Sequence, residues 1–158
     1  MRRSDREIIA ISEIIEIINK CDICRLAFSD NNTPYIVPMN FGYEYENNQL
    51  TLYFHGAKDG KKYDIIKNNP VACFEMDCSC KLIEADEACK YTMEYESVIG
   101  SGVIIMCEKT DEKIHAFKMI MEKYAKTKEF NFPDHALDVV NIFKLSVSEF
   151  TGKRLIKA

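Results

Sequence analysis

Apolar residues recur at helical spacing in two segments, one near the N-terminus and one in the last third of the chain. Within residues 5–20, isoleucines share one helical face: Ile8, Ile11, Ile14, Ile15 and Ile18. Ser4 and Glu7 have the spacing of a capping box, which predicts that this helix begins at Asp5. A second amphipathic helix is predicted from Asp111, with an apolar face made of Ile114, Phe117, Met121 and Tyr124.

Between these helices, apolar residues alternate with polar ones or form short runs bounded by turn residues. The pattern predicts strands over residues 24–29, 35–45, 49–55, 71–78, 92–108, 139–147 and 151–154. Pro38 lies inside the second strand. Because proline cannot donate a backbone hydrogen bond, that strand is expected at a sheet edge or a bulge. A short helix is predicted over residues 63–68, and a loop over residues 81–90.

The order of these elements indicates the fold class. Strands fill the middle of the chain and long helices flank them, whereas a parallel α/β sheet would alternate the two. The sequence therefore predicts an α+β fold, mainly β, built on an antiparallel barrel with flanking helices. A length of 158 residues suits one domain, and no repeat or low-complexity segment interrupts it, so residues 1–158 are expected to form a single domain.

The charge balance narrows the classes of partner. The chain has 21 Lys and Arg against 25 Asp and Glu, a net charge of -4, and so lacks the broad basic field that nucleic-acid binding requires. No apolar run approaches membrane-spanning length, and no apolar block with a small-residue cleavage site follows the N-terminus. We therefore expect a cytoplasmic protein with neither a nucleic-acid nor a membrane partner.

The most distinctive polar segment is HGAKDGKK, residues 55–62, which we call the lysine turn. It lies between a predicted strand and the short helix. Its small residues, which let backbone amides approach a ligand, are Gly56, Ala57 and Gly60. Its positive charge comes from Lys58, Lys61 and Lys62. Beside a helix N-terminus this composition favours a phosphate, although a solvated turn without a ligand explains the residues equally well. The sequence contains neither the Walker spacing of nucleoside triphosphate sites nor the GxGxxG spacing of dinucleotide sites, so neither class of ligand is favoured.

Seven cysteines raise the question of a metal site. The pairs Cys21/Cys24 and Cys78/Cys80 together offer four thiols for zinc. However, a CxC spacing suits a zinc knuckle poorly, so buried free thiols are favoured and no metal is expected. The histidines are isolated in sequence, and His55 stands out only because it opens the lysine turn. No GxSxG motif supports hydrolytic chemistry.

Five stretches follow one another along nearly the whole chain: residues 35–43 (YIVPMNFGY), 52–62 (LYFHGAKDGKK), 69–74 (NPVACF), 95–102 (YESVIGSG) and 148–153 (SEFTGK). Together they resemble the FMN-binding split barrel of the pyridoxamine 5'-phosphate oxidase-like superfamily. Within it, the chain is most similar to Nim-type 5-nitroimidazole antibiotic resistance proteins. Each stretch is weak alone, and their combined order and spacing carry the resemblance.

The resemblance implies a six-stranded antiparallel split β-barrel that forms a homodimer, with FMN or a related flavin bound at the interface. The flavin ring would lie against Val37, Pro38, Met39 and Asn40. The phosphate end would be held by His55, Gly56, Ala57, Lys58, Gly60, Lys61 and Lys62, of which Lys62 matches the family's usual lysine. Ser97 and Val98 match a segment near the cofactor. An arginine-rich substrate-phosphate site is missing from the chain, so vitamin B6 oxidation is disfavoured.

The implied function is an FMN-dependent oxidoreductase that reduces a small oxidised acceptor, such as a nitroimidazole-like nitro compound. His55 is the expected catalytic residue, because a neutral imidazole can supply a proton near neutral pH. Contact with a phosphate or with the substrate fits His55 equally well, and its neighbours also fit a purely structural histidine. The alternatives are a non-catalytic flavin-binding or carrier protein, and a split barrel that uses haem or the deazaflavin F420, since fold does not settle function.

Overall fold

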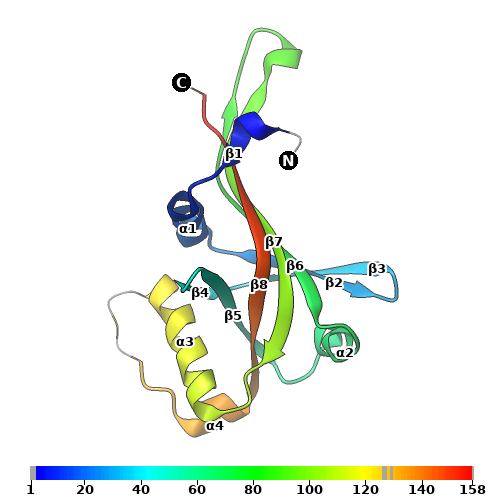
Figure 1. Cartoon of the computed structure of the whole chain (residues 1–158), viewed down its shortest axis with the longest axis vertical. Coiled ribbons are helices and arrows are strands. Elements are labelled where there is room, and N and C mark those ends of the chain that lie inside the picture. Colours follow the sequence, from blue (N-terminus) through cyan, green and yellow to red (C-terminus); the bar gives the residue numbers. More distant parts are fainter. Residues whose placement is uncertain (1–2, 126–127, 129, 158) are drawn as a thin grey trace.

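The computed structural model describes residues 3–125, 128 and 130–157 (Figure 1). Its strands are β1 (Glu7–Ile8), β2 (Cys24–Asp30), β3 (Thr33–Met39), β4 (Gly42–Glu46), β5 (Gln49–Ala57), β6 (Val71–Ile83), β7 (Thr92–Met106) and β8 (Val140–Leu155). Its helices are α1 (Ile11–Lys20), α2 (Lys61–Asn68), α3 (Thr110–Tyr124) and α4 (Asp134–Asp138), with short 3-10 turns at η1 (Ser4–Arg6) and η2 (Ala88–Lys90).

The strands of the described residues form one antiparallel sheet in the order β3-β2-β6-β7-β8-β5-β4, with β1 added beside β8. The predicted α+β split barrel is confirmed. The sheet has eight strands where the resemblance implies six. Of the seven strands that the sequence pattern predicts, residues 35–45 divide into β3 and β4, residues 139–147 and 151–154 are joined in β8, and β1 is an additional short strand. The division falls at Asn40 and Phe41, where the Phe41 side chain turns into the core and is fully buried.

The first helix begins later than the capping-box pattern predicts. Glu7 and Ile8 are extended and pair with Lys153 and Gly152 of β8, so Glu7 is not available to cap a helix at Ser4. Helix α1 starts at Ile11 after Ala10 instead. The pairing is favoured because Gly152 has no side chain, which lets Ile8 and Ile14 pack directly over it.

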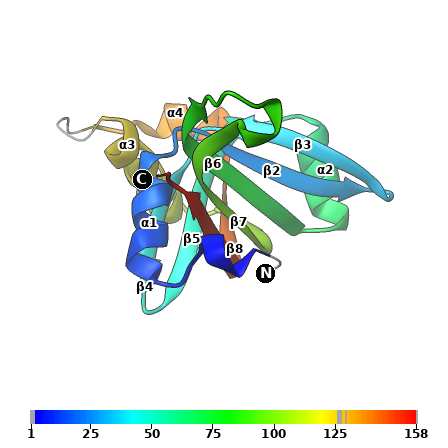
Figure 2. The ribbon, with the colours of Figure 1, turned by 90° about the horizontal axis from the view of Figure 1, so that it is seen from above.

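Strand β5 separates two hydrophobic cores, and this arrangement positions the site. On one face Phe54 joins the barrel core, which α1 and α2 cover with buried isoleucines. On the other face Tyr53 joins a smaller cluster under α3 and α4. Helices α2 and α3 accordingly lie on opposite sides of the molecule in both views (Figures 1 and 2). Successive side chains of β5 therefore point to opposite faces, one toward the barrel core and the next toward the cluster under α3 and α4.

Helix α3 is fixed to the rest of the molecule at its C-terminal end. The Lys123 ammonium donates to the carbonyl oxygens of Ile18 and Asn19 at 2.9 and 3.0 Å, and the Tyr124 hydroxyl donates to the Asp22 carbonyl oxygen at 2.7 Å. These bonds satisfy carbonyl groups at and just beyond the end of α1. Among the described residues, no helix has both the length and the apolar character needed to cross a membrane.

Candidate functional site

The lysine turn connects the end of β5 to the start of α2. Ala57 is the last residue of β5 and Lys61 the first of α2, with Lys58 and Gly60 exposed between them. Gly60 has a φ of +147°, a backbone conformation that only glycine adopts readily, and its carbonyl oxygen accepts a bond from the Tyr63 amide at 3.0 Å. The turn is thereby held to its helix.

A second anchor comes from β8. Asn141 pairs with Gly56 in the sheet, and its side-chain amide donates to the Lys58 carbonyl oxygen at 2.7 Å. Within the part of the chain that the structure describes, no side chain caps the N-terminus of α2, so the amide groups of its first turn have no side-chain acceptor there. The turn is thus rigidly placed, and its helix N-terminus retains the partial positive charge that attracts anions.

Two polar side chains converge on Gly56. A Cβ atom built at this glycine would lie 2.7 Å from the Tyr63 hydroxyl oxygen and 3.1 Å from the Lys62 Nζ. Glycine is therefore required for the two groups to approach the end of β5 this closely. We call the space beside Gly56, bounded by Lys62 and Tyr63, the Gly56 cradle.

The Lys62 ammonium has surroundings that suit an anionic ligand. Among the residues that the structure describes, no carboxylate forms an ion pair with it, and its Nζ lies 4.4 Å from the centre of the Tyr63 ring. Burial lowers the pKa of Lys62, because desolvation disfavours its charged form. A phosphate in the cradle would supply the missing counter-charge, so the residues present fit the phosphate end of a flavin nucleotide.

Lys61, its neighbour in sequence, points elsewhere. Its Nζ forms an ion pair with the Asp30 carboxylate at 2.9 Å and lies 5.0 Å from the centre of the Tyr35 ring. The bond to Asp30 raises the pKa of Lys61. The structure therefore separates two lysines that the sequence grouped together: Lys62 faces the Gly56 cradle, and Lys61 holds α2 against the β2–β3 hairpin.

His55 lies on the opposite face of β5 from the cradle. Its ring packs against Phe117 of α3, with the ring centres 5.5 Å apart, and its buried Nδ1 has no hydrogen-bond partner among the described residues. Burial lowers the pKa of His55, so the imidazole is neutral at neutral pH. Within one chain, the His55 ring therefore packs against α3, whereas the Lys62 ammonium approaches Gly56.

The segment expected beside the flavin ring forms a free sheet edge. Strand β3 pairs with β2 alone, and Pro38 lies opposite Arg25 on that edge strand, as its missing amide predicts. Val37 and Met39 are half-buried, while Pro38 and Asn40 are exposed. The edge begins beside the lysine turn at Tyr35 and reaches Asn40 after roughly 17 Å. Lys61 is the residue of the lysine turn that contacts this edge.

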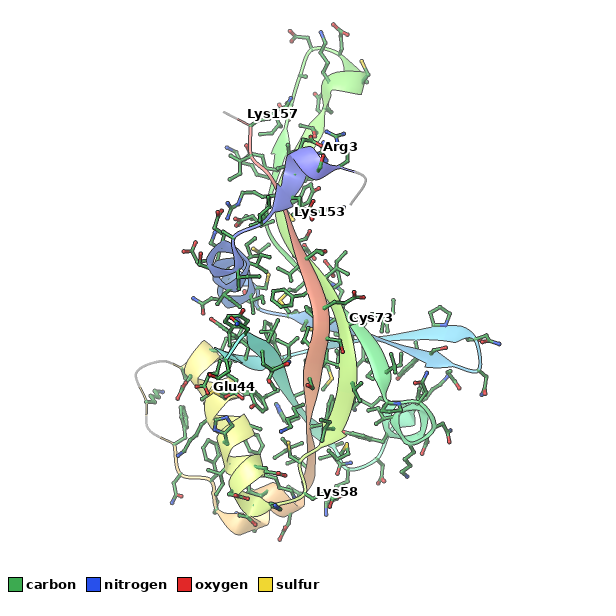
Figure 3. The ribbon with its side chains drawn as sticks, viewed as in Figure 1. Arg3, Glu44, Lys58, Cys73, Lys153 and Lys157 are labelled. Carbon is green, nitrogen blue, oxygen red and sulfur yellow. The ribbon has the colours of Figure 1, made fainter. Side chains whose placement is uncertain are left out.

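Ser97 and Val98 lie far from the lysine turn in the same chain. Ser97 pairs with Lys153 of β8, whereas Gly56 pairs with Asn141, and this separation along β8 corresponds to roughly 40 Å. Figure 3 shows Lys153 and Lys58 toward opposite ends of β8. Val98 is fully buried in the barrel core. Ser97 instead lines an open hollow of about 300 Å³ with Glu7, Ile99, Thr151 and Lys153.

Two residues around the lysine turn, Tyr63 in the cradle and Asn141 as an anchor, were not predicted from the sequence. Tyr63 read as an ordinary helix residue, although its position directly after Lys62 places it at the same helix terminus. Asn141 lies far away in sequence, in a strand with no distinguishing motif, so no local pattern pointed to it. All seven cysteines are free, and the described part of the chain contains no group of three or more His, Cys, Asp or Glu residues placed to hold a metal ion.

Comparisons with known proteins agree with this architecture. A solved structure of a candidate 5-nitroimidazole antibiotic resistance protein from Bacteroides thetaiotaomicron shares 34% sequence identity, with a TM-score of 0.82 over 94% of this chain and 86% of that one. The flavocytochrome Anf3 from Azotobacter vinelandii has a TM-score of 0.82 at 14% identity, covering 99% of this chain and 72% of its own. That second likeness concerns the fold alone.

A third structure, a FAD and heme binding protein from Mycobacterium smegmatis, has a TM-score of 0.81 at 10% identity, covering 96% of this chain and 74% of its own. No curated protein matches the chain significantly. The family model described as pyridoxamine 5'-phosphate oxidase matches residues 11–154, which include the whole lysine turn, the β3 edge and Ser97. The chain therefore belongs to the pyridoxamine 5'-phosphate oxidase family.

Proposed function

We propose that the protein binds FMN in a homodimer and uses it to reduce a small oxidised acceptor of the nitroaromatic class. The observation that carries this proposal is the Gly56 cradle, where the Lys62 ammonium and the Tyr63 hydroxyl meet beside a helix N-terminus. No carboxylate of the described residues pairs with Lys62. Family membership supports a flavin as the ligand, and the 34% identical relative supports a nitroimidazole-like acceptor.

Each residue group has a distinct role in this proposal. Lys62, Gly56 and the first turn of α2 hold the phosphate end, while Lys58 and Gly60 shape the turn through their carbonyl oxygens. Val37, Pro38, Met39 and Asn40 give the ring an edge that is free of a neighbouring strand. Bound FMN supplies the redox chemistry, and the protein orients it and excludes water. His55 takes no part in phosphate binding within the same chain.

A second copy of the chain would complete the site. Ser97 is too far from the lysine turn to share a flavin with it in one chain, so its predicted cofactor contact requires the partner subunit. The sheet also carries an exposed apolar face, on which Val71 and Val103 lie opposite each other in neighbouring strands. The exposed apolar residues of this face are Ile36, Val71, Ile99, Val103 and Ile105. Such a patch is typical of a subunit interface.

Val103→Asp is expected to weaken the dimer at least tenfold, because the two-fold symmetry of a dimer would bury a carboxylate from each copy. Val139→Asp is the matched control, since Val139 is 66% exposed and lies outside this face. Sedimentation velocity over a range of protein concentrations measures both variants. A parent protein that stays monomeric while it holds FMN would contradict the interfacial site.

The function itself is tested by adding FMN to the apo-protein and following binding by the quenching of flavin fluorescence. The loaded protein is then reduced anaerobically with NADH or dithionite and mixed with a 5-nitroimidazole. Loss of the nitro absorption with reoxidation of the flavin is the expected result. Tight FMN binding without acceptor reduction would indicate a flavin carrier. Retention of haem or F420 in place of FMN would overturn the proposal.

A further inference from the structure

We propose that the Tyr63 hydroxyl is a direct ligand of the flavin phosphate and the second donor of the Gly56 cradle beside Lys62. This inference rests on the proposed function and assigns a binding residue to it. The Tyr63 side chain is 6% exposed, and its hydroxyl oxygen is buried without a hydrogen-bond partner among the described residues. A buried hydroxyl without a partner is costly, so its retention needs an explanation.

Packing does not provide that explanation. The ring meets the edge of Phe143 at 6.1 Å between centres and belongs to the barrel core with Ile65 and Ile66. A phenylalanine would make the same apolar contacts and would leave no polar atom unpaired. One N–H of the nearby Asn141 amide donates to the Lys58 carbonyl oxygen at 2.7 Å. Asn141 also interacts with the Tyr63 hydroxyl and opposes the rise in the Tyr63 pKa that burial causes. No hydrogen bond satisfies the hydroxyl among the described residues, so a ligand oxygen can still accept from it.

The direction of the hydroxyl identifies its partner. It lies where a Gly56 side chain would stand, the same position that the Lys62 ammonium approaches. The ammonium rests over the Tyr63 ring, so moving this one flexible side chain opens the cradle and brings two donors to one ligand oxygen. An uncapped helix N-terminus lies beside them. The ammonium, the hydroxyl and the helix N-terminus all favour a negatively charged ligand. Since no carboxylate of the described residues pairs with Lys62, a phosphate is favoured over a neutral group.

The test is Tyr63→Phe, which keeps the ring and removes only the hydroxyl. We expect the affinity for FMN to fall about tenfold, the scale of one hydrogen bond to a charged group. The affinity for riboflavin, which lacks the phosphate, should stay the same. The melting temperature of the apo-protein should stay the same or rise, because the variant no longer buries an unpaired hydroxyl. Fluorescence titration and differential scanning calorimetry measure these quantities.

Tyr43→Phe is the matched control, since Tyr43 is a half-buried tyrosine of β4 outside the cradle. It should change neither affinity. Equal losses for FMN and riboflavin in Tyr63→Phe, or a lower apo melting temperature, would show a structural role and overturn the assignment. If the parent binds FMN no more tightly than riboflavin, the proposed phosphate-binding site is wrong, and that part of the proposed function fails instead. If the parent prefers FMN and Tyr63→Phe retains the full preference, only the Tyr63 assignment fails.

Discussion

Replacing Glu96 with alanine is expected to lower the free energy of unfolding by about 3 kcal/mol at neutral pH. Glu96 is only 3% exposed, yet its carboxylate accepts bonds from the Lys20 ammonium at 2.8 Å, the Arg154 guanidinium at 2.7 Å and the Ser79 hydroxyl at 2.8 Å. These partners come from α1, β8 and the bulge in β6. Removing the carboxylate would leave the half-exposed Lys20 ammonium without its anion and the Arg154 guanidinium paired with Glu13 alone.

The pH dependence of this effect follows from the pKa of Glu96. Burial opposes its ionisation, but the bonds from Lys20, Ser79 and Arg154 outweigh burial and lower the pKa from 4.5 to about 2. Because the pKa is lowered on folding, the stabilisation is fully present above the ordinary value. It is lost as the pH falls from about 4.5 toward 2. The difference between parent and variant should therefore shrink in acid.

Urea unfolding of the parent and Glu96→Ala at pH 7 and pH 3 measures both effects. Glu16→Ala is the control, because Glu16 is exposed on α1, and it should change stability by less than about 0.5 kcal/mol. A Glu96→Ala loss below about 1 kcal/mol, or one that is the same at both pH values, would contradict the assigned role of this network.

Lys62→Ala is expected to reduce FMN affinity by about 100-fold, whereas Lys61→Ala should reduce it by less than about threefold. The two lysines are adjacent in sequence, and only Lys62 approaches Gly56. Lys61 is committed to Asp30, in an exposed ion pair of the kind that contributes little to stability. Lys61→Ala is therefore the matched control for Lys62→Ala in a test of the proposed phosphate site.

Fluorescence titration with FMN and riboflavin measures the lysine variants. Riboflavin affinity should be nearly unchanged in both, since it carries no phosphate for either lysine to bind. Lys62→Ala should leave the apo melting temperature unchanged or slightly raised, because the partly buried ammonium has no carboxylate partner among the described residues. Similar FMN losses in the two variants would show that the turn acts as a diffuse positive field rather than through the Gly56 cradle.

The fold class of this protein could be predicted from the order of residues along the chain, because the signals for helices, strands and turns are local. Alternation with period two identified the strands, and strands flanked by helices indicated the antiparallel barrel. Pro38 indicated an edge strand because proline has no backbone N–H to donate to a neighbouring strand. The small residues and lysines of residues 55–62 likewise marked a turn before a helix, and the structure places that turn between β5 and α2.

The contacts of the individual side chains in that turn could not be predicted in the same way, because they join residues that are distant in the chain. Lys61 forms an ion pair with Asp30, whereas Lys62 lies beside Gly56. No pattern in the sequence of the turn predicts this difference. His55 and Gly56 are neighbours, but the two cores on either side of β5 send them to opposite faces. Sequence spacing identifies the candidate binding segments. The pairing of β5 with β8 and the packing of α2 decide which side chains meet.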